Sequence, residues 1–272
     1  MINILVVGEE SWKIPERADV AIYCRKNPAD VDLYSDSSRT LYMLNESDKW
    51  IVVDYVIWRC QFCENYSIEH KILDLINFTK TKCINSARTN IMFGHNISMF
   101  NAMNECNMPV IPRRFMIGRR STVFVHPECD VEVFKIGDYH SGYAKSIIRN
   151  KETYQDTIDM ACLFDNIQSL EPFVNYVQDV RILKIGASFG AYERIPSMWK
   201  ANVCPHFLKE LLINDIPAEI IEHTNALSEY IKADVVGVDW IKDEDGHWYA
   251  LEANLAPGME KEDNYKKIVS LL

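Results

Sequence analysis

The feature that most constrains this chain is a predicted β-hairpin near its C-terminus. Asp245-Gly246 is a strong signal for a two-residue turn between strands of alternating polarity. With that turn, Asp239 lies directly opposite Glu252, and Asn254 shares their face because side chains on a strand repeat every two residues. Opposed like charges repel on a sheet, and a hard divalent cation such as Mg²⁺ removes that conflict. The hairpin therefore predicts a metal site for a phosphate-bearing substrate, with a solvated acidic face as the alternative.

The remaining positions of the hairpin fit the same register. Gly237, which has no side chain, lies opposite Asn254. The other face of the hairpin is apolar and is typical of a buried core; it consists of Val238, Trp240, Leu251 and Ala253. A turn longer than two residues would shift this register and weaken the argument.

The composition of the chain excludes several classes of protein. Its 272 residues are 48% hydrophobic with no low-complexity run, which predicts a folded protein of enzyme size. A net charge of −10 and a pI near 5.2 argue against a broad nucleic-acid surface and against a basic membrane patch. No apolar stretch approaches the roughly 18 residues of a membrane span. Residues 1–8 carry no basic segment before their apolar run, so they are typical of a first strand and not of a signal peptide.

The eight cysteines are scattered along the sequence. Cys60 and Cys63 form the only Cys-x-x-Cys pair, and no second pair completes a zinc site. A redox role for the pair is one interpretation, and reduced, partly buried thiols of an intracellular protein are the other. We therefore expect a cytoplasmic protein.

The order of predicted elements indicates an α/β fold that becomes α+β in its later part. A helix between parallel strands predicts a small doubly wound sheet over about the first 90 residues; the strands are 2–8, 50–58 and 81–84, and the helix is 67–78. Antiparallel strands dominate after a helix at 96–107. The later strands are 115–117, 131–137, 143–149, 169–176, 180–186 and 191–195, and the later helices are 153–167, 218–231 and 260–271. We predict three domains, with boundaries at 1–90, 91–175 and 176–272.

One apolar strand carries a lysine in its middle. Lys135 precedes a short loop with Ser141-Gly142, and Lys145 lies on the returning strand. An unpaired buried ammonium is costly, and a bound phosphate removes that cost. Glycine in the loop lets backbone N–H groups approach phosphate oxygens. An ordinary hairpin with a snorkelling lysine is the alternative.

Further charged and polar side chains follow on the next strands. Asp179 and Arg181 share one strand face and are expected to pair, which holds the guanidinium ready to grip a phosphate bidentately; a surface ion pair is the alternative. Arg194 and Lys200 add positive charge near the same sheet, and Asn202 adds a neutral polar group. In a chain of net charge −10, such a cluster before an acidic hairpin fits polyphosphate with Mg²⁺.

These motifs, in this order, resemble the ATP-grasp superfamily over about residues 80 to 272. Lys135 with Ser141-Gly142 is similar to its phosphate-covering strand and loop. The connector that holds adenine resembles Glu171, Pro172, Phe173 and Val174. The resemblance implies that Lys145 and Asp179 also belong to the nucleotide site and that Asp239, Glu252 and Asn254 are magnesium ligands.

Within the superfamily, three stretches are most similar to synapsins: 135–145, 171–186 and 191–202. The end, Leu251-Glu-Ala-Asn-Leu-Ala-Pro-Gly258, is more similar to amino-acid ligases such as the ribosomal-protein glutamate ligases. One departure is clear, because the expected helix start reads His95-Asn96-Ile97-Ser98 and lacks the lysine that such ligases commonly carry there.

The resemblance implies an ATP-dependent carboxylate–amine ligase that forms an amide through an acylphosphate and releases ADP. The substrates would be a small carboxylate and an amine, such as an amino acid or peptide, and Arg181 and Arg194 would hold the reacting carboxylate with Lys200 and Asn202 as helpers. A synapsin-like ATP-binding regulatory or scaffolding protein and a small-molecule kinase are the alternatives. A homodimer is common in this superfamily.

Overall fold

The computed structural model gives this fold in enough detail to place most of the candidate site. It describes residues 1–9, 19–60, 66–117, 131–137, 144–161, 167–196, 199, 206–259 and 261–272. Several sequence predictions fall outside these ranges, namely those for Cys63, Ser141, Gly142, Lys200 and Asn202.

The N-terminal part is the predicted parallel sheet. Its four strands have the order β2-β1-β6-β7, and every neighbouring pair is parallel. The strands are β1 (Ile2–Val7), β2 (Val20–Arg25), β6 (Tyr55–Trp58) and β7 (Lys82–Ile84), with the helices α1 (Tyr66–Thr79) and α2 (Ala87–Phe93). Apolar residues of β1, β6 and α1 form one core, including Leu5, Val56 and Leu73.

The predicted single strand 50–58 is wrong, because this segment forms two strands in different sheets. A small antiparallel sheet contains β3 (Leu33–Ser35), β4 (Leu41–Leu44) and β5 (Trp50–Val52), and a short 3-10 turn, Pro28–Asp30, precedes it. The chain leaves this sheet at Val53 and Asp54 and enters β6. The Asp54 carboxylate accepts a hydrogen bond of 2.7 Å from the backbone N–H of Asn3, which fixes the break beside β1.

The middle of the chain forms a four-stranded antiparallel sheet of order β10-β9-β11-β8. It follows the helix α3 (Asn96–Glu105) and consists of β8 (Arg114–Ile117), β9 (Glu132–Ile136), β10 (Lys145–Ile148) and β11 (Ile167–Pro172), with the helix α4 (Lys151–Ala161). Tyr154 and Ile158 of α4 pack against Phe134 and Leu170 of the sheet.

The C-terminal part is a five-stranded antiparallel sheet of order β14-β13-β12-β15-β16. Its elements are β12 (Tyr176–Ile185), β13 (Ser188–Pro196), β14 (His206–Leu211), a 3-10 turn Ile213–Asp215, α5 (Ala218–Ile231), β15 (Val235–Asp243), β16 (Trp248–Asn254) and α6 (Glu262–Val269). The helix predicted at 218–231 has the predicted bounds, and no prediction anticipated β2, β3, β4, α2 or β14.

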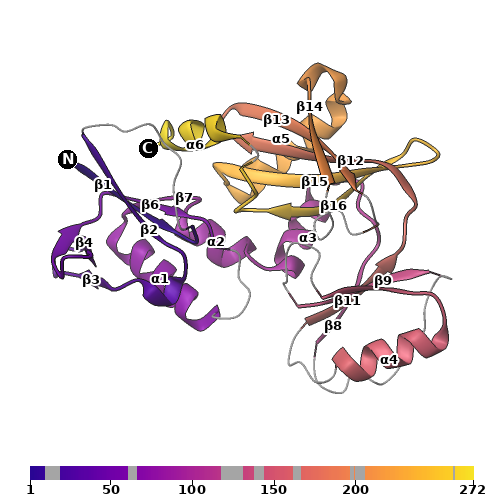
Figure 1. Cartoon of the computed structure of the whole chain (residues 1–272), viewed down its shortest axis with the longest axis horizontal. Helices are drawn as coiled ribbons and strands as arrows, with labels where there is room; N and C mark the ends of the chain where they lie inside the picture. The colour runs from indigo at the N-terminus through magenta and orange to yellow at the C-terminus, as the bar shows by residue number, and fades with distance from the viewer. Residues whose placement is uncertain are drawn as a thin grey trace.

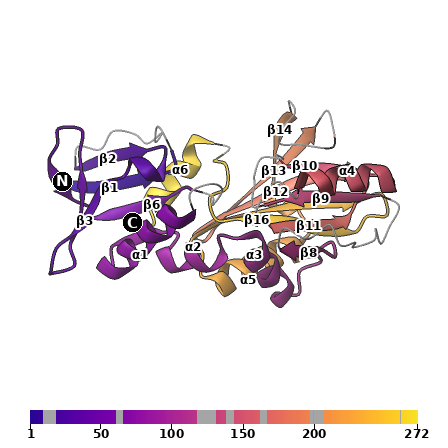
Figure 2. The same cartoon turned by 90° about the horizontal axis from the view of Figure 1, so that it is seen from below.

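The arrangement of the sheets creates the space for a ligand. The parallel sheet and the small sheet of β3, β4 and β5 lie at one end of the molecule, and the four-stranded antiparallel sheet lies at the other (Figures 1 and 2). Met103 of α3 and Leu227 of α5 pack with Val180 and Trp240 on one face of the five-stranded sheet. Asp239, between Val238 and Trp240 on β15, points to the opposite face, where it lines a cavity. The fold class predicted from the sequence is confirmed, and the three domain boundaries stay predictions.

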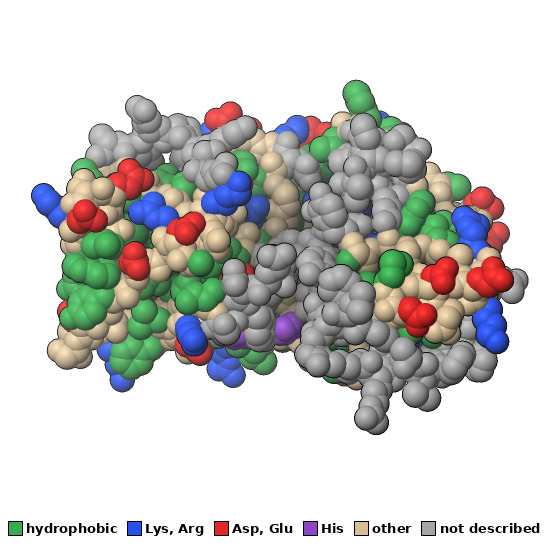
Figure 3. Space-filling view, turned by 60° about the horizontal axis from the view of Figure 1, so that its bottom comes forward, with side chains coloured by type: hydrophobic (Ala, Val, Ile, Leu, Met, Phe, Trp, Pro, Cys, Tyr) green, Lys and Arg blue, Asp and Glu red, His purple; other side chains and the backbone are tan. Residues whose placement is uncertain are grey.

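Two surface properties accompany this fold. On the face drawn in Figure 3, the coloured lysine and arginine side chains are interspersed with acidic ones. Within the described ranges, no helix has both the length and the apolar character needed to cross a membrane.

Candidate active site

The hairpin of β15 and β16 brings the three predicted metal ligands together. Asp239 is paired with Glu252 across the hairpin, and Gly237 is paired with Asn254, as the sequence predicted. The Asn254 amide nitrogen lies 3.5 Å from a Glu252 carboxylate oxygen. The three side chains therefore share one face at the end of the hairpin.

The turn that led to this register is nevertheless wrong. The loop between Asp243 and His247 has one residue more than predicted, with Gly246 at φ 91°. A β-bulge after Asp239 compensates for this shift, because it leaves Leu251 as an extra residue between two paired positions. The prediction that Leu251 belongs to the core is also wrong, since its side chain lines the cavity beside Glu252.

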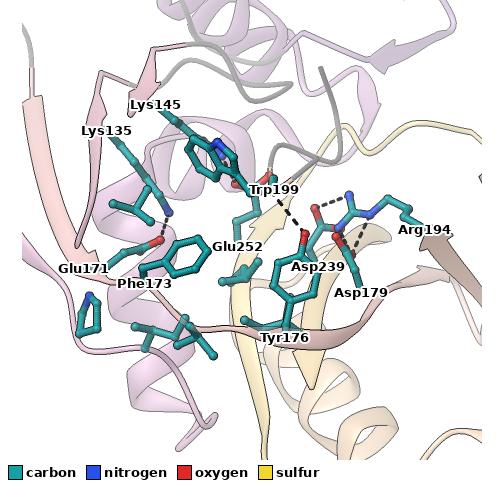
Figure 4. Close-up of a pocket in the computed structure, with 16 residues that line it drawn as sticks. Lys135, Lys145, Glu171, Phe173, Tyr176, Asp179, Arg194, Trp199, Asp239 and Glu252 are labelled. Atoms are coloured by element: carbon teal, nitrogen blue, oxygen red, sulfur yellow. Dashed lines mark hydrogen bonds and ion pairs between the residues drawn. The ribbon is translucent and has the colours of Figure 1, made fainter. Parts of the chain in front are cut away.

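Two arginines neutralise Asp239. Its carboxylate accepts hydrogen bonds from Arg181 Nε at 2.7 Å and Nη2 at 3.0 Å. It also accepts one from Arg194 Nη1 at 3.0 Å, which Figure 4 shows. Burial raises the pKa of Asp239, but the two guanidinium groups outweigh burial and hold that pKa below its usual range. Asp239 is therefore a buried carboxylate that stays ionised.

The expected pair of Asp179 with Arg181 is replaced by a different one. Asp179 Oδ1 accepts from Nε of Arg194 at 2.8 Å and lies 2.5 Å from its Nη2. Burial raises the pKa of Asp179 to about 6, and the neighbouring Asp239 carboxylate acts in the same direction while Arg194 opposes them. Arg181 pairs with Asp239 instead, because those two residues are opposite each other on β12 and β15.

The lysine in the apolar strand has a protein partner in the structure. Lys135 Nζ lies 2.5 Å from Glu171 Oε1, and Glu171 is buried. Burial lowers the pKa of Lys135 to about 8, although the Glu171 carboxylate raises it. Burial alone would raise the pKa of Glu171, but Lys135 and Arg113 hold it below its usual range. The resemblance assigned Glu171 to the adenine connector, and the structure adds a role for its side chain.

Arg113 is a site residue that the sequence reasoning missed. Its guanidinium contacts the second oxygen of Glu171, with Nε at 2.7 Å and Nη2 at 2.6 Å. The available signal was an arginine after Pro112, directly before an apolar strand, where an unpaired charge is costly. Its partner is 58 residues away in the sequence, so no local pattern reveals the pair.

Lys135, Glu171, Asp179, Arg194 and Asp239 all border one cavity of about 100 Å³ between the four-stranded and the five-stranded sheet. Lys135, Lys145 and Glu252 lie in it, and the Lys145 ammonium is 3.3 Å from Glu252 Oε2. Figure 4 shows Phe173 and Trp199 in the same cavity, with ring centroids 6.4 Å apart and planes at 75°. The connector residues Pro172 and Val174 border it as well, and so does Tyr176. The cavity thus combines aromatic surface with ammonium groups and carboxylates.

The donor set of the hairpin fits a magnesium ion. Two carboxylates and an amide oxygen are the hard ligands that Mg²⁺ prefers. Asp239 and Glu252 are directly opposed like charges that Arg181, Arg194 and Lys145 balance in this structure. A bound cation would compete with these protein cations for the carboxylate oxygens.

The comparison with known families identifies the chain. The sequence profile described as "Synapsin, ATP binding domain" matches residues 80–263. This chain belongs to the synapsin ATP-binding domain family. It therefore has the ATP-grasp fold, and the match spans the four-stranded and five-stranded antiparallel sheets and ends at the second residue of α6.

Solved structures of ATP-grasp ligases share this fold at low sequence identity. D-alanyl-alanine synthetase A from Vibrio cholerae superposes with a TM-score of 0.73 at 13% identity, covering 99% of this chain and 93% of that one. The macrocyclase MdnC from Microcystis aeruginosa, bound with its precursor peptide MdnA, gives 0.72 at 13%, covering 100% and 99%. The ligase PsnB, complexed with a precursor variant, Mg and ADP, gives 0.68 at 13%, covering 96% and 93%. These superpositions extend over β1, β2 and β6 of the N-terminal sheet, which precede the residues that the family profile matches.

Proposed function

We propose that this synapsin-family chain is an ATP-dependent carboxylate–amine ligase that forms an amide through an acylphosphate and releases ADP. The observation that supports it most is the cavity, in which Lys135 and Lys145 of the four-stranded sheet face the acidic β15–β16 hairpin of the five-stranded sheet. A site of this kind does little covalent work, because it positions the reactants and neutralises charge in the transition state.

The side chains divide the task between binding and charge balance. When bound, ATP supplies the phosphoryl group, and Mg²⁺ held by Asp239, Glu252 and Asn254 offsets its negative charge. Lys135 and Lys145 line the cavity, where their ammonium groups would balance the negative charge of the phosphate oxygens. Phe173 and Trp199 offer apolar surface to the adenine base. The assignments of the metal ligands and lysines keep the roles predicted from the sequence, whereas the role of Trp199 is added from the structure.

The reacting carboxylate needs cations of its own. Arg181 and Arg194 are held in fixed orientations by Asp239 and Asp179, so they lose little entropy when an anion arrives. The substrate carboxylate is phosphorylated to an acylphosphate, and the amine then attacks its carbonyl carbon. The new C–N bond forms as the C–O bond to phosphate breaks, and the amine loses its proton. We assign the helper roles to Lys200 and Asn202 from the sequence alone.

A synapsin-like binding protein without turnover is the second candidate. The match to the synapsin profile favours it, and so does the absence of a lysine at the start of α3, where the sequence reads His95-Asn96-Ile97. Both candidates bind ATP in the same cavity. They differ in whether ADP is released in response to an acid and an amine.

A coupled assay of ADP release separates these candidates. The wild-type protein with ATP and Mg²⁺ is screened against pairs of amino acids and short peptides as acid and amine. We expect release that requires both partners, and we expect Glu252→Ala to abolish it while the folded state is kept. ADP release by Glu252→Ala at the wild-type rate would refute the metal assignment, and release with a hydroxyl acceptor alone would indicate a kinase.

A further inference from the structure

Arg113 is a buried arginine whose guanidinium joins the two sheets that form the cavity. Its side chain is 6% exposed and lies just before β8. On one side it grips Glu171 of β11 through Nε and Nη2. On the other side, Nη2 donates to the backbone carbonyl of Leu251 at 2.9 Å. Arg113 is thus bonded to both the lysine-bearing sheet and the metal hairpin.

Each end of this bridge adjoins a group of the candidate active site. Glu171 uses its other carboxylate oxygen to hold the Lys135 ammonium. Leu251 is the extra residue of the bulge and immediately precedes Glu252. A shift of Arg113 would therefore move Lys135 relative to Glu252, across the space where phosphate oxygens would lie.

The surroundings of Arg113 hold it in one orientation. Its guanidinium carbon lies 4.8 Å from the ring centroid of Phe100 in α3 and 5.9 Å from that of Phe115 in β8. The two ring centroids are themselves only 5.6 Å apart, so the guanidinium packs against one aromatic pair that restricts its motion on that side. The preceding backbone is also fixed, because the carbonyl of Pro109 accepts from the N–H of Ala250 in β16 at 2.8 Å. Arg113 itself is not one of the described residues that line the cavity.

We propose that Arg113 is a positioning residue that sets the distance between the Lys135 ammonium and the metal-binding end of β16. This inference rests on the ATP site of the proposed function. An arginine is needed because a planar fork can hold a carboxylate with two N–H groups and still donate to a carbonyl. A lysine at this position keeps the charge but provides only one point of attachment.

The charge of Arg113 also influences the pKa of Lys135, so the pH dependence of ATP binding reports on Arg113. The charged groups that face Lys135 are Glu171 from β11, Lys145 from β10, Glu252 from β16 and Arg113 itself. Arg113 and Lys145 disfavour the ammonium, whereas Glu171 and Glu252 favour it. Removing the Arg113 charge therefore raises the pKa of Lys135 above its value of about 8. The pH at which ATP affinity declines should then move upward.

ATP affinity measured by calorimetry as a function of pH, in EDTA, tests this inference. Arg113→Met is expected to weaken ATP binding about tenfold at neutral pH and to shift the decline to higher pH. Arg113→Lys is expected to weaken binding to a similar extent with the wild-type pH profile, since it keeps the charge. Arg114→Met is the matched control, because the neighbouring Arg114 pairs with Glu132 instead. It should leave both quantities unchanged.

The outcomes separate a positioning role from a purely structural one. If Arg113→Met lowers the melting temperature but binds ATP with the wild-type affinity and pH profile, the proposal is wrong. If Arg113→Met does not fold, the double variant with Glu171→Gln is used, because it lacks the carboxylate that Arg113→Met leaves unpaired. ATP affinity is then also measured on Arg113→Lys, which keeps the charge. Wild-type ATP binding without ligase turnover would refute the proposed function and leave this inference intact. No ATP binding by the wild-type protein would overturn both.

Discussion

At the scale of single residues, the site is a set of buried charges whose partners come from different strands. Asp239 is shared by Arg181 and Arg194, and Arg194 is shared in turn with Asp179. Buried charges are tolerated when they are paired and hydrogen-bonded, and they become costly when a partner is removed. The same charges that prepare the site for an anion thus contribute to the stability of the five-stranded sheet.

Asp239→Asn tests this double role with little change of shape. Two arginines would then face a neutral amide, and we expect the free energy of unfolding to fall by about 3 to 5 kcal/mol. Mg²⁺-dependent ATP binding should be lost as well. Denaturant unfolding measures the first effect, and Asp243→Asn at the end of the same strand is the control, since it should change stability by less than about 1 kcal/mol. Equal stabilities of the two variants would contradict a stabilising role of the Asp239 carboxylate.

At the scale of elements, the β15–β16 hairpin shows how a correct pairing of Asp239 with Glu252 was predicted from an incorrect turn. Alternating polarity placed Asp239, Glu252 and Asn254 on one face, and this local signal was sufficient. The extra loop residue and the bulge at Leu251 cancel each other, so the pairing at the metal end is the predicted one. A bulge of this kind has no sequence signature in this chain, because Leu251 alternates correctly for a regular strand.

Two glycines of this hairpin separate effects on the site from effects on the turn. A Cβ at Gly237 would lie 2.5 Å from Cβ of Pro257, so Gly237→Ala should displace the loop after Asn254 and weaken Mg²⁺-dependent ATP binding. A Cβ at Gly246 would meet nothing closer than 3.9 Å, but its φ of 91° is unfavourable for alanine. Gly246→Ala should therefore cost about 1 to 2 kcal/mol of stability and leave ATP affinity unchanged. Thermal unfolding with and without ATP and Mg²⁺ measures both the stability and the ATP binding of each variant. Equal loss of ATP affinity in the two variants would contradict the expected difference between Gly237 and Gly246.

The pairs between distant elements were beyond reach of the sequence. Arg113 and Glu171 are 58 residues apart and meet only because β8 and β11 are neighbours. The same limit explains the wrong pairing of Asp179 with Arg181, which share a strand, whereas the actual partner of Asp179 comes from β13. Periodicity locates side chains on a face, and strand order decides which of them meet. The strand β14 was missed because His206–Leu211 mixes charged and apolar residues without regular alternation.

At the scale of the whole molecule, the parallel sheet and the five-stranded sheet share one core. Ile4 and Val6 of β1 are buried with Leu183 and Ile185 of β12. Asn85, after β7, adds buried polar contacts: its side chain exchanges hydrogen bonds with the backbone N–H and carbonyl of Val235 and also donates to the carbonyl of Leu255. The segment that matches the synapsin profile is therefore not separated from the residues before it.

A fragment of residues 80–272, the part similar to ATP-grasp proteins by sequence, should not fold well alone. It would expose Leu183, Ile185 and Tyr192, which are buried in the full chain. Exposed contiguous apolar surface of this kind leads to aggregation. Size-exclusion chromatography of the fragment beside the full chain tests this expectation. A monodisperse fragment with cooperative thermal unfolding would show that the two parts are independent.

The proposed ligase activates a carboxylate as an acylphosphate in the cavity between the four-stranded and the five-stranded sheet. Transfer of oxygen-18 tests this most directly. The wild-type protein is incubated with ATP, Mg²⁺, an amine and amino acids labelled with oxygen-18 in their carboxyl groups, and the released phosphate is analysed by mass spectrometry. We predict that one labelled oxygen appears in inorganic phosphate, because the amine displaces phosphate that carries a carboxylate oxygen. Phosphate without label, formed at a rate independent of the acid and amine, would contradict the ligase assignment and favour a protein that binds ATP without ligase chemistry.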